Sequence, residues 1–374
     1  MAKLQAVILA AGQSKRFNTG NTKLLEKVCG QEIILYQTSL LSSLEIPTTI
    51  VVGHQAERIQ SKICCQHGDA IKFVAQEKLL GRGHALLCSQ NEWVAEDVIV
   101  MNADTPFVTE EIVTNLLSKH RKSEAALSIV KSHCCESSPA SYDHIIKNDD
   151  GQIEIVSMHE CKESFQESCC IDSGIYVIDR EFLKECAAQI PHDNKATRHF
   201  HIGDLIREAN RKGYAVELVP APFDRIRSID TFQDLWCAQQ VKRAELLKYW
   251  MGKGVHFFTA QNVHLDISVE IGAGAFIGCG VQLFGKTRIG NNTHVGHFSI
   301  IEECVLGNNV TISPHSVLTK TIVEPDTTIG PFAHLTHTKV DPSAVVSNHA
   351  ATEKENSPTM NPKHTGATKL RDFC

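Results

Sequence analysis

The sequence predicts an α/β domain with a mixed, mainly parallel sheet, followed by a short parallel β-solenoid. Three observations lead to this fold class. Residues 1–228 alternate strand-like and helix-like segments, a long helical segment follows, and from Leu265 onward aliphatic residues recur at every sixth position. A chain of 374 residues also exceeds the size of one typical core, which favours two domains.

Apolar, β-branched runs in the first part are typical of buried strands. The run "LQAVILAA" is followed by "TTIVVGH", "AIKFVAQ", "EDVIVMNAD", "AALSIVKS" and "SGIYVIDR". Amphipathic stretches such as "EIILYQTSLLSSL" and "TEEIVTNLLSKH" lie between them. Strands separated by helices indicate βαβ units, and such sheets bind ligands at the carboxyl ends of their strands. We assign residues 1–228 to this domain.

Residues 229–252 are predicted to form a connecting helix that ends at the glycines of "MGKGV". Residues 253–338 then carry an aliphatic residue, often followed by glycine, at six-residue spacing. A period this short is typical of stacked β-coils with three hexads each, and we expect about twelve hexads in about four coils. Residues 339–374 are polar and are predicted to form an irregular tail.

Composition excludes several classes of function. The net charge of −6 argues against a nucleic-acid binder, which needs a basic face. The sequence has no apolar run of membrane-spanning length and no signal-peptide pattern, so we expect a cytoplasmic protein without a membrane partner. The 14 cysteines form no CxxC motif, and we expect them to be reduced thiols.

The stretch "ILAAGQSKRF" places small residues at the end of the first predicted strand. Backbone N–H groups on such a turn are free to contact phosphates, and Ala10, Ala11 and Gly12 leave them unobstructed. Downstream, Arg16 and Lys23 supply positive charge to offset phosphates and a leaving pyrophosphate. Each of these signals is weak when taken alone.

Two carboxylates follow apolar runs. Asp104 ends the strand "EDVIVMNAD", and Asp230 follows an apolar stretch near the predicted domain boundary. Magnesium prefers carboxylates together with phosphate oxygens, so the two side chains are candidate ligands of one Mg²⁺ ion.

The combination and order of these segments resemble one family, the bifunctional N-acetylglucosamine-1-phosphate uridylyltransferase / glucosamine-1-phosphate acetyltransferase. The resemblance covers residues 4–335. It rests on "LAAGQSKRF" with Lys23, "VVGHQAE", "FVAQEKLLGRGHAL", "MNADTPFV", "IDSGIYVI", "HIGDLI" and the repeat through "TIGPFAHL". It implies a Rossmann-like nucleotidyltransferase domain, a linker helix and a left-handed β-helix.

The resemblance further implies a Mg²⁺-dependent reaction in which UTP and N-acetylglucosamine 1-phosphate give UDP-N-acetylglucosamine and pyrophosphate. Arg16 and Lys23 correspond to the catalytic residues, and Asp104 and Asp230 to the metal ligands. The nucleotide-binding positions are Leu9, Ala10, Ala11, Gly12, Gln76, Gly81 and Arg82. The sugar-binding positions are Asn102, Ala103, Asp143, Glu160 and Asp172.

The chain departs from the family pattern chiefly around the sugar. Ser14 and Lys15 replace glycine and threonine in the loop, and Arg82 replaces a threonine beside the base. Further replacements are Ala103 for glycine, Asp143 for glycine and Asp172 for asparagine, and the family's glutamate aligns with Met158 or, after a shift, with Glu160. The identity of the sugar is therefore less determined than that of the nucleotide.

The acetyltransferase part departs further. His334 stands where the family has an arginine, and Gly366 and Lys369 occupy its histidine and tyrosine positions. Because a general base is missing there, we expect no acetyltransferase activity. The resemblance implies a homotrimer through the β-helix. Two alternatives stay open: a nucleotidyltransferase for another sugar 1-phosphate, and a non-catalytic nucleotide-binding or assembly protein.

Overall fold

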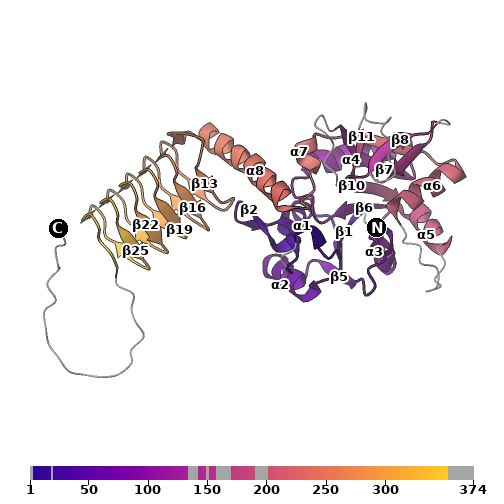
Figure 1. Cartoon of the computed structure of the whole chain (residues 1–374), viewed down its shortest axis with the longest axis horizontal. Coiled ribbons are helices and arrows are strands. Elements are labelled where there is room, and N and C mark those ends of the chain that lie inside the picture. The colour runs from indigo at the N-terminus through magenta and orange to yellow at the C-terminus, as the bar shows by residue number, and fades with distance from the viewer. Residues whose placement is uncertain are drawn as a thin grey trace, which may run out of the picture. The chain divides into compact units, whose positions relative to one another are not determined.

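The structure is a computed structural model, and it describes residues 3–17, 20–133, 142–148, 151–156, 170–189 and 201–352. The chain divides into two compact units, Met1–Leu246 and Leu247–Cys374 (Figure 1). Within the described ranges, no helix is long and apolar enough to cross a membrane.

The first unit is built on one nine-stranded sheet. Its strands are β1 Leu4–Ala10, β4 Thr48–Val52, β5 Lys72–Ala75, β6 Asp97–Asn102, β7 Leu127–His133, β8 His144–Lys147, β9 Ile153–Val156, β10 Cys170–Asp179 and β11 Val216–Pro220. The main path runs β11-β7-β10-β6-β1-β4-β5, and β8 and β9 extend from β10. Strand β10 is antiparallel to β6 and β7, whereas β1, β4, β5 and β6 are parallel neighbours. The predicted mixed, mainly parallel sheet is confirmed.

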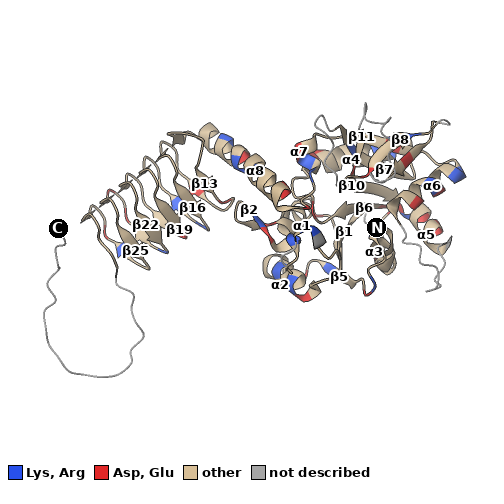
Figure 2. Cartoon of the chain, viewed as in Figure 1, with Lys and Arg blue, Asp and Glu red and all other residues tan. Residues whose placement is uncertain are grey.

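Helices occupy the connections between these strands. They are α1 Ile33–Ser43, α2 Ala56–His67, α3 Arg82–Cys88, α4 Glu110–Ser123, α5 Arg180–Gln189, α6 Ile202–Lys212 and α7 Phe223–Ile226. Short 3₁₀ turns η1 Lys15–Phe17, η2 Lys23–Leu25 and η3 Gln90–Glu92 and a hairpin of β2 Lys27–Val28 and β3 Gln31–Glu32 complete the unit. Charges of both signs are interspersed on α2, α5 and α6 (Figure 2).

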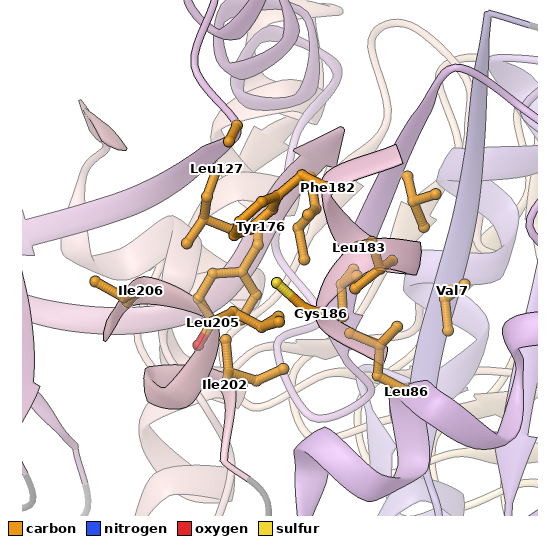
Figure 3. Packing of buried hydrophobic residues seen from close by; sticks show 14 of the residues in the cluster. Val7, Leu86, Leu127, Tyr176, Phe182, Leu183, Cys186, Ile202, Leu205 and Ile206 are labelled. Carbon is orange, nitrogen blue, oxygen red and sulfur yellow. The ribbon is translucent and has the colours of Figure 1, made fainter. Parts of the chain in front are cut away.

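One face of the sheet forms a core with the helices α3, α5 and α6 (Figure 3). Side chains alternate between the two faces of a strand, so one face receives residues two positions apart. The pairs Val7 and Leu9, Val98 and Val100, Leu127 and Ile129, and Tyr176 and Ile178 all belong to this cluster. The helices contribute Leu86, Leu183 and Leu205, each at most 1% exposed. Burial of this apolar face fixes the strand register, and hence where each strand ends.

The second unit is a β-helix of very short parallel strands. They are β12 His256–Phe257, β13 His264–Leu265, β14 Glu270–Ile271, β15 Phe276–Ile277, β16 Gln282–Phe284, β17 Arg288–Ile289, β18 His294–Val295, β19 Ile300–Glu302, β20 Val305–Leu306, β21 Thr311–Ile312, β22 Val317–Thr319, β23 Ile322–Val323, β24 Thr328–Ile329, β25 His334–Thr336, β26 Lys339–Val340 and β27 Val345–Val346. Every third strand stacks in parallel, which gives three faces of six, five and five strands. The hexad aliphatics point inward; Leu265, Ile277 and Ile301 are fully buried. The predicted left-handed parallel β-helix is confirmed.

The predicted end of the β-helix at residue 338, and the estimate of four coils, are wrong. Strands β26 and β27 continue the stack, and Ala351 still bridges to His334. Val340 remains 8% exposed at the inward position. A coil needs only its inward residues to be apolar, so polar residues at the outer positions hide the repeat in the sequence. The rest of the predicted tail, residues 353–374, lies outside the described residues.

The helix between the repeats and the sheet is α8, Phe232–Gly252. Residues 232–246 of this helix belong to the first compact unit and the remainder to the second. Asp234 accepts hydrogen bonds from the Thr231 backbone N–H (2.9 Å) and hydroxyl (2.8 Å), and Thr231 Oγ1 accepts one from the Asp234 N–H. This reciprocal capping begins the helix directly after Asp230.

Candidate active site

A cleft of about 540 Å³ lies within the first unit, at the carboxyl ends of the central strands. It is lined by every predicted site residue except Glu160, which lies outside the described residues. These residues are Leu9, Ala10, Ala11, Gly12, Arg16, Lys23, Gln76, Gly81, Arg82, Asn102, Ala103, Asp104, Asp143, Asp172 and Asp230. Gln13, Ser14, Leu79, Tyr142, Ser173 and Ser228 also line it, although the sequence pattern did not single them out as ligand contacts.

Strand register explains why residues so distant in the sequence meet. Leu9 of β1 lies opposite Asn102 of β6, and the Ala103 N–H donates to the Leu9 carbonyl (3.2 Å). On the other side, the Gln76 N–H donates to the Val52 carbonyl (2.7 Å). Parallel strands that end level with one another place their following residues along a single edge.

The loop after β1 depends on an unusual backbone conformation at Ser14. Its φ is 52°, in the left-handed region that favours glycine. Its hydroxyl accepts a hydrogen bond from the Lys23 N–H (3.0 Å), and its carbonyl accepts one from the Phe17 N–H (3.0 Å). The serine thus takes up a left-handed conformation at the position where the resemblance places a glycine, and its hydroxyl ties the loop to Lys23.

We predict that Ser14→Gly preserves function and that Ser14→Val impairs it. Glycine relieves the left-handed strain but loses a hydrogen bond worth about 1 kcal/mol, so the two effects offset each other. Valine loses the bond and retains a strain on the order of 1–2 kcal/mol. Thermal unfolding and steady-state turnover of both variants test this. Equal behaviour of the glycine and valine variants would contradict it.

Lys23 lies between two carboxylates at the centre of the cleft. Its Nζ is 2.6 Å from Asp104 Oδ2 and 2.6 Å from Asp230 Oδ1, and Arg16 Nη1 lies 3.0 Å from Asp230 Oδ2. The Lys23 side chain is 13% exposed, whereas that of Arg16 is 57% exposed. Burial by itself lowers the pKa of Lys23, but the two carboxylates outweigh it and the pKa lies above the ordinary value.

Backbone contacts hold the two carboxylates in place. Gln37 Nε2 donates to the carbonyls of Asn102 (2.7 Å) and Thr105 (2.8 Å), which bracket Asp104. The Ile229 N–H donates to the Asp104 carbonyl (2.9 Å), and this bond brings the segment of Asp230 alongside. Gln37 was missed by sequence reasoning. The available signal was a polar side chain within the apolar helical run "ILYQTSLL".

The residues present fit a divalent cation. Asp104 Oδ1 is buried and has no hydrogen-bond partner, and carboxylates of Asp104 and Asp230 converge on one positive charge. The described part of the chain holds no cluster of three or more His, Cys, Asp or Glu suited to a metal. A two-carboxylate site matches Mg²⁺, which commonly takes one or two carboxylates and completes its shell with phosphate oxygens and water.

Gln76 lies at the end of the cleft beyond β5 and is 4% exposed. Its Nε2 contacts the Gly81 carbonyl (3.1 Å) and His84 Nδ1 (2.9 Å). Burial, with a smaller contribution from Lys78, lowers the pKa of His84, so the imidazole is neutral at pH 7 and able to accept at Nδ1. These two acceptors fix the orientation of the amide group.

Two groups of charged residues form the opposite end of the cleft: the buried Asp172 with its hydrogen-bond donors, and the ion pair of Arg82 with Asp143. Asp172 is 6% exposed; its carboxylate accepts hydrogen bonds from the Tyr176 hydroxyl (2.5 Å) and the Gly174 N–H (3.0 Å). Burial raises its pKa, and the charge of Arg82 opposes that rise. Arg82 Nη2 in turn pairs with Asp143 Oδ2 at 2.7 Å. The substituted positions 82 and 143 thus form an ion pair.

Tyr142 completes this side of the cleft. Its hydroxyl accepts a hydrogen bond from the Ser228 N–H (2.7 Å), and burial raises its pKa to about 12. The phenol is therefore neutral at physiological pH. It secures the chain just before Asp230, a contact that no sequence pattern indicated.

Comparison with known proteins agrees with this geometry. Residues 6–147 match the family described as the MobA-like NTP transferase domain, and residues 286–320 match the bacterial transferase hexapeptide family. One similar crystal structure is that of a Bacillus anthracis protein in complex with sucrose, which is described as a glucose-1-phosphate thymidylyltransferase. Its TM-score is 0.52 at 17% identity, over 64% of this chain and 94% of that chain, a likeness that shows the fold alone.

Curated relatives extend across both domains. The bifunctional protein GlmU of Syntrophotalea carbinolica is 31% identical over 310 residues, 81% of this chain and 65% of the relative. That of Limosilactobacillus reuteri is 30% identical over 308 residues, 81% of this chain and 66% of the relative. The chain thus spans just under two thirds of the length of these proteins.

A nucleotidyltransferase sheet carrying this cleft, followed by hexapeptide repeats, defines the class of sugar-phosphate nucleotidyltransferases. The matches to the curated GlmU proteins extend over 81% of this chain and so point to one group within this class. The chain is similar to GlmU proteins across both of its domains, in agreement with the sequence resemblance.

Proposed function

We propose that this protein transfers UMP from UTP to N-acetylglucosamine 1-phosphate, giving UDP-N-acetylglucosamine and pyrophosphate. The observation that carries the proposal is the cluster of Lys23, Asp104, Asp230 and Arg16 beside the loop after β1. Two cations and two carboxylates at the mouth of a phosphate-binding turn suit a reaction between polyanions.

In the proposed reaction, a phosphate oxygen of the sugar phosphate attacks the α-phosphorus of UTP. The bond from that phosphorus to the bridging oxygen breaks, and pyrophosphate leaves with the electron pair. No covalent enzyme intermediate is required, so positioning and charge neutralisation carry the catalysis. When bound at Asp104 and Asp230, Mg²⁺ would supply further charge neutralisation at the phosphates.

The chain's own residues have distinct tasks in this proposal. The backbone of Leu9 to Gly12 holds the nucleotide, since a Cβ on Gly12 would meet nothing within 4 Å and the turn is open. Lys23 and Arg16 neutralise the phosphates and the leaving pyrophosphate. Gln76 and Gly81 recognise uracil, because an oriented amide and a peptide group pair with a base edge.

The sugar is assigned to the end of the cleft with Asn102, Asp143 and Asp172. Asn102 packs directly on Gly174, where a Cβ would overlap its amide. The Asp172 N–H donates to the Asp143 carbonyl (2.9 Å), so the two positions are held next to each other. Carboxylate oxygens accept hydrogen bonds from sugar hydroxyls, and both Asp143 and Asp172 line this part of the cleft.

Release of pyrophosphate from defined pairs of substrates tests the proposal. The full chain is incubated with Mg²⁺, UTP or dTTP, and the 1-phosphates of N-acetylglucosamine, glucosamine and glucose. We expect the fastest release with UTP and N-acetylglucosamine 1-phosphate. Faster release with another pair would instead assign the protein to another sugar. No release with any pair would favour the non-catalytic alternative.

We also propose that the β-helix assembles the protein as a homotrimer. Phe258, Phe298 and Phe332 are each more than half exposed on its surface. His315 stacks between the rings of Phe298 and Phe332, with centroid distances of 5.4 Å and 5.2 Å. Exposed apolar surface of this kind is typical of contact surfaces. We predict the mass of three chains in light scattering; a monomer would contradict this.

A further inference from the structure

The ammonium group of Lys23 lies between two carboxylates of the cleft. Its Nζ contacts one oxygen of Asp104 and one of Asp230 at the same distance, 2.6 Å. These carboxylates are the ones that the proposed function assigns to Mg²⁺. Asp104 Oδ1 has no partner, but both oxygens of Asp230 are engaged, one by Lys23 and one by Arg16. A divalent ion bound by both carboxylates would need an Asp230 oxygen, so it competes with these side chains for the same ligands.

The charges of the cluster balance without any metal. Lys23 and Arg16 contribute two positive charges, and Asp104 and Asp230 contribute two negative ones. A divalent ion entering the nucleotide-free cleft would leave two positive charges in excess in a partly buried place, which is unfavourable. A bound triphosphate reverses that balance because it brings several negative charges with it.

The contacts of Lys23 also allow its side chain to reorient toward bound phosphates. Its backbone is anchored through the Ser14 hydroxyl, next to the loop that is proposed to hold the phosphates. Its four-carbon stem carries a compact charge on rotatable bonds. The side chain can therefore turn from the carboxylates to phosphate oxygens while the backbone stays in place. Arg16, with its side chain 57% exposed, is less confined still.

We propose that Lys23 acts as an internal substitute for the divalent cation in the nucleotide-free protein. The phosphates of the nucleotide draw Lys23, and with it Arg16, away from the carboxylates and open the metal site. Nucleotide and metal thus bind cooperatively, and the empty enzyme excludes free divalent ions. This inference rests on the proposed function for the identity of the nucleotide, but not for the competition between Lys23 and the metal.

Binding of Mn²⁺ alone to the nucleotide-free full chain tests the competition. Free Mn²⁺ is measured by electron paramagnetic resonance, and circular dichroism checks that each variant is folded. We expect Lys23→Met and Lys23→Gln to bind Mn²⁺ more tightly than the wild type by a factor on the order of ten or more. Equal affinities of wild type and both folded variants would overturn the inference.

Two controls locate the effect. Lys72 forms an ion pair of similar length with Glu92 (2.7 Å) outside the cleft, so Lys72→Met should leave Mn²⁺ binding at the wild-type level. Adding Asp104→Asn to Lys23→Met should remove the gain. A gain that persists in this double variant would show that the ion binds elsewhere, which also overturns the inference.

Repeating the titration with UTP separates this inference from the proposed function. In the wild type, UTP should raise the Mn²⁺ affinity of the protein more strongly than it does in Lys23→Met. A protein that does not bind UTP would contradict the proposed function, while the nucleotide-free comparison would still decide the role of Lys23. UTP binding with an equal gain in both proteins would count against the inference alone.

Discussion

Replacing Asp104 by Asn is expected to lower pyrophosphate release by about a hundredfold to a thousandfold. The substitution preserves shape but removes one of the two negative charges that converge on Lys23. It also changes the only buried carboxylate oxygen among the described residues that lacks a hydrogen-bond partner. The variant loses the charge that the proposed Mg²⁺ site needs and leaves the ammonium group of Lys23 with Asp230 alone.

The measurement is the initial rate of pyrophosphate release at saturating UTP and sugar phosphate over a range of Mg²⁺ concentrations. We expect the loss to persist at high Mg²⁺, because a carboxamide does not replace a carboxylate as a ligand. Asp69→Asn, at an exposed position after α2, is the matched control and should retain the wild-type rate. A wild-type rate in Asp104→Asn would remove Asp104 from the metal site.

Gly296→Ala is expected to destabilise the β-helix by about 1–3 kcal/mol or more, the usual range for overpacking. Gly296 follows β18, and a Cβ there would lie 2.6 Å from the Pro314 nitrogen and 2.8 Å from the Ile312 carbonyl oxygen of the next coil. Both obstacles are backbone atoms. They cannot move aside without disrupting the pairing of β18 with β21.

Thermal unfolding of the full chain, followed by circular dichroism, measures this effect. Gly252→Ala is the matched control, because a Cβ there meets nothing within 4 Å and the residue ends a helix. Alanine is favoured over glycine in helices, so the control should be neutral or slightly stabilised. The prediction fails if Gly296→Ala unfolds at the same temperature as Gly252→Ala.

The periodicity of the sequence was sufficient to predict both architectures. Nearly continuous apolar runs along β1 and β6 indicate strands of a buried sheet, and the six-residue spacing from Leu265 indicates the β-helix, because each pattern reflects which side chains are removed from water. The end of the β-helix was not predictable in this way. There, the inward aliphatics Val340 and Val346 lie between polar neighbours, and the stack continues through backbone pairing.

The site was predictable as a set of residues but not as an arrangement. The order of motifs along the chain identified Lys23, Asp104 and Asp230 as site residues, because the end of a strand and a turn of small residues can be recognised from the local sequence. That Lys23 joins the two carboxylates follows only from the register of β6 against β1 and from the bond of Ile229 to Asp104. The same holds for Gln37 of helix α1, whose contacts bracket Asp104.

By itself, then, the sequence determined the fold of each domain, the family that the chain resembles and most of the residues that line the cleft, since these depend on local pattern and composition. The tertiary structure alone decided how those residues are arranged: Ser14 in a left-handed conformation, Arg82 paired with Asp143, and Lys23 between Asp104 and Asp230. Pairing depends on distances between segments up to about two hundred residues apart, and these are set by sheet register and core packing rather than by any local signal.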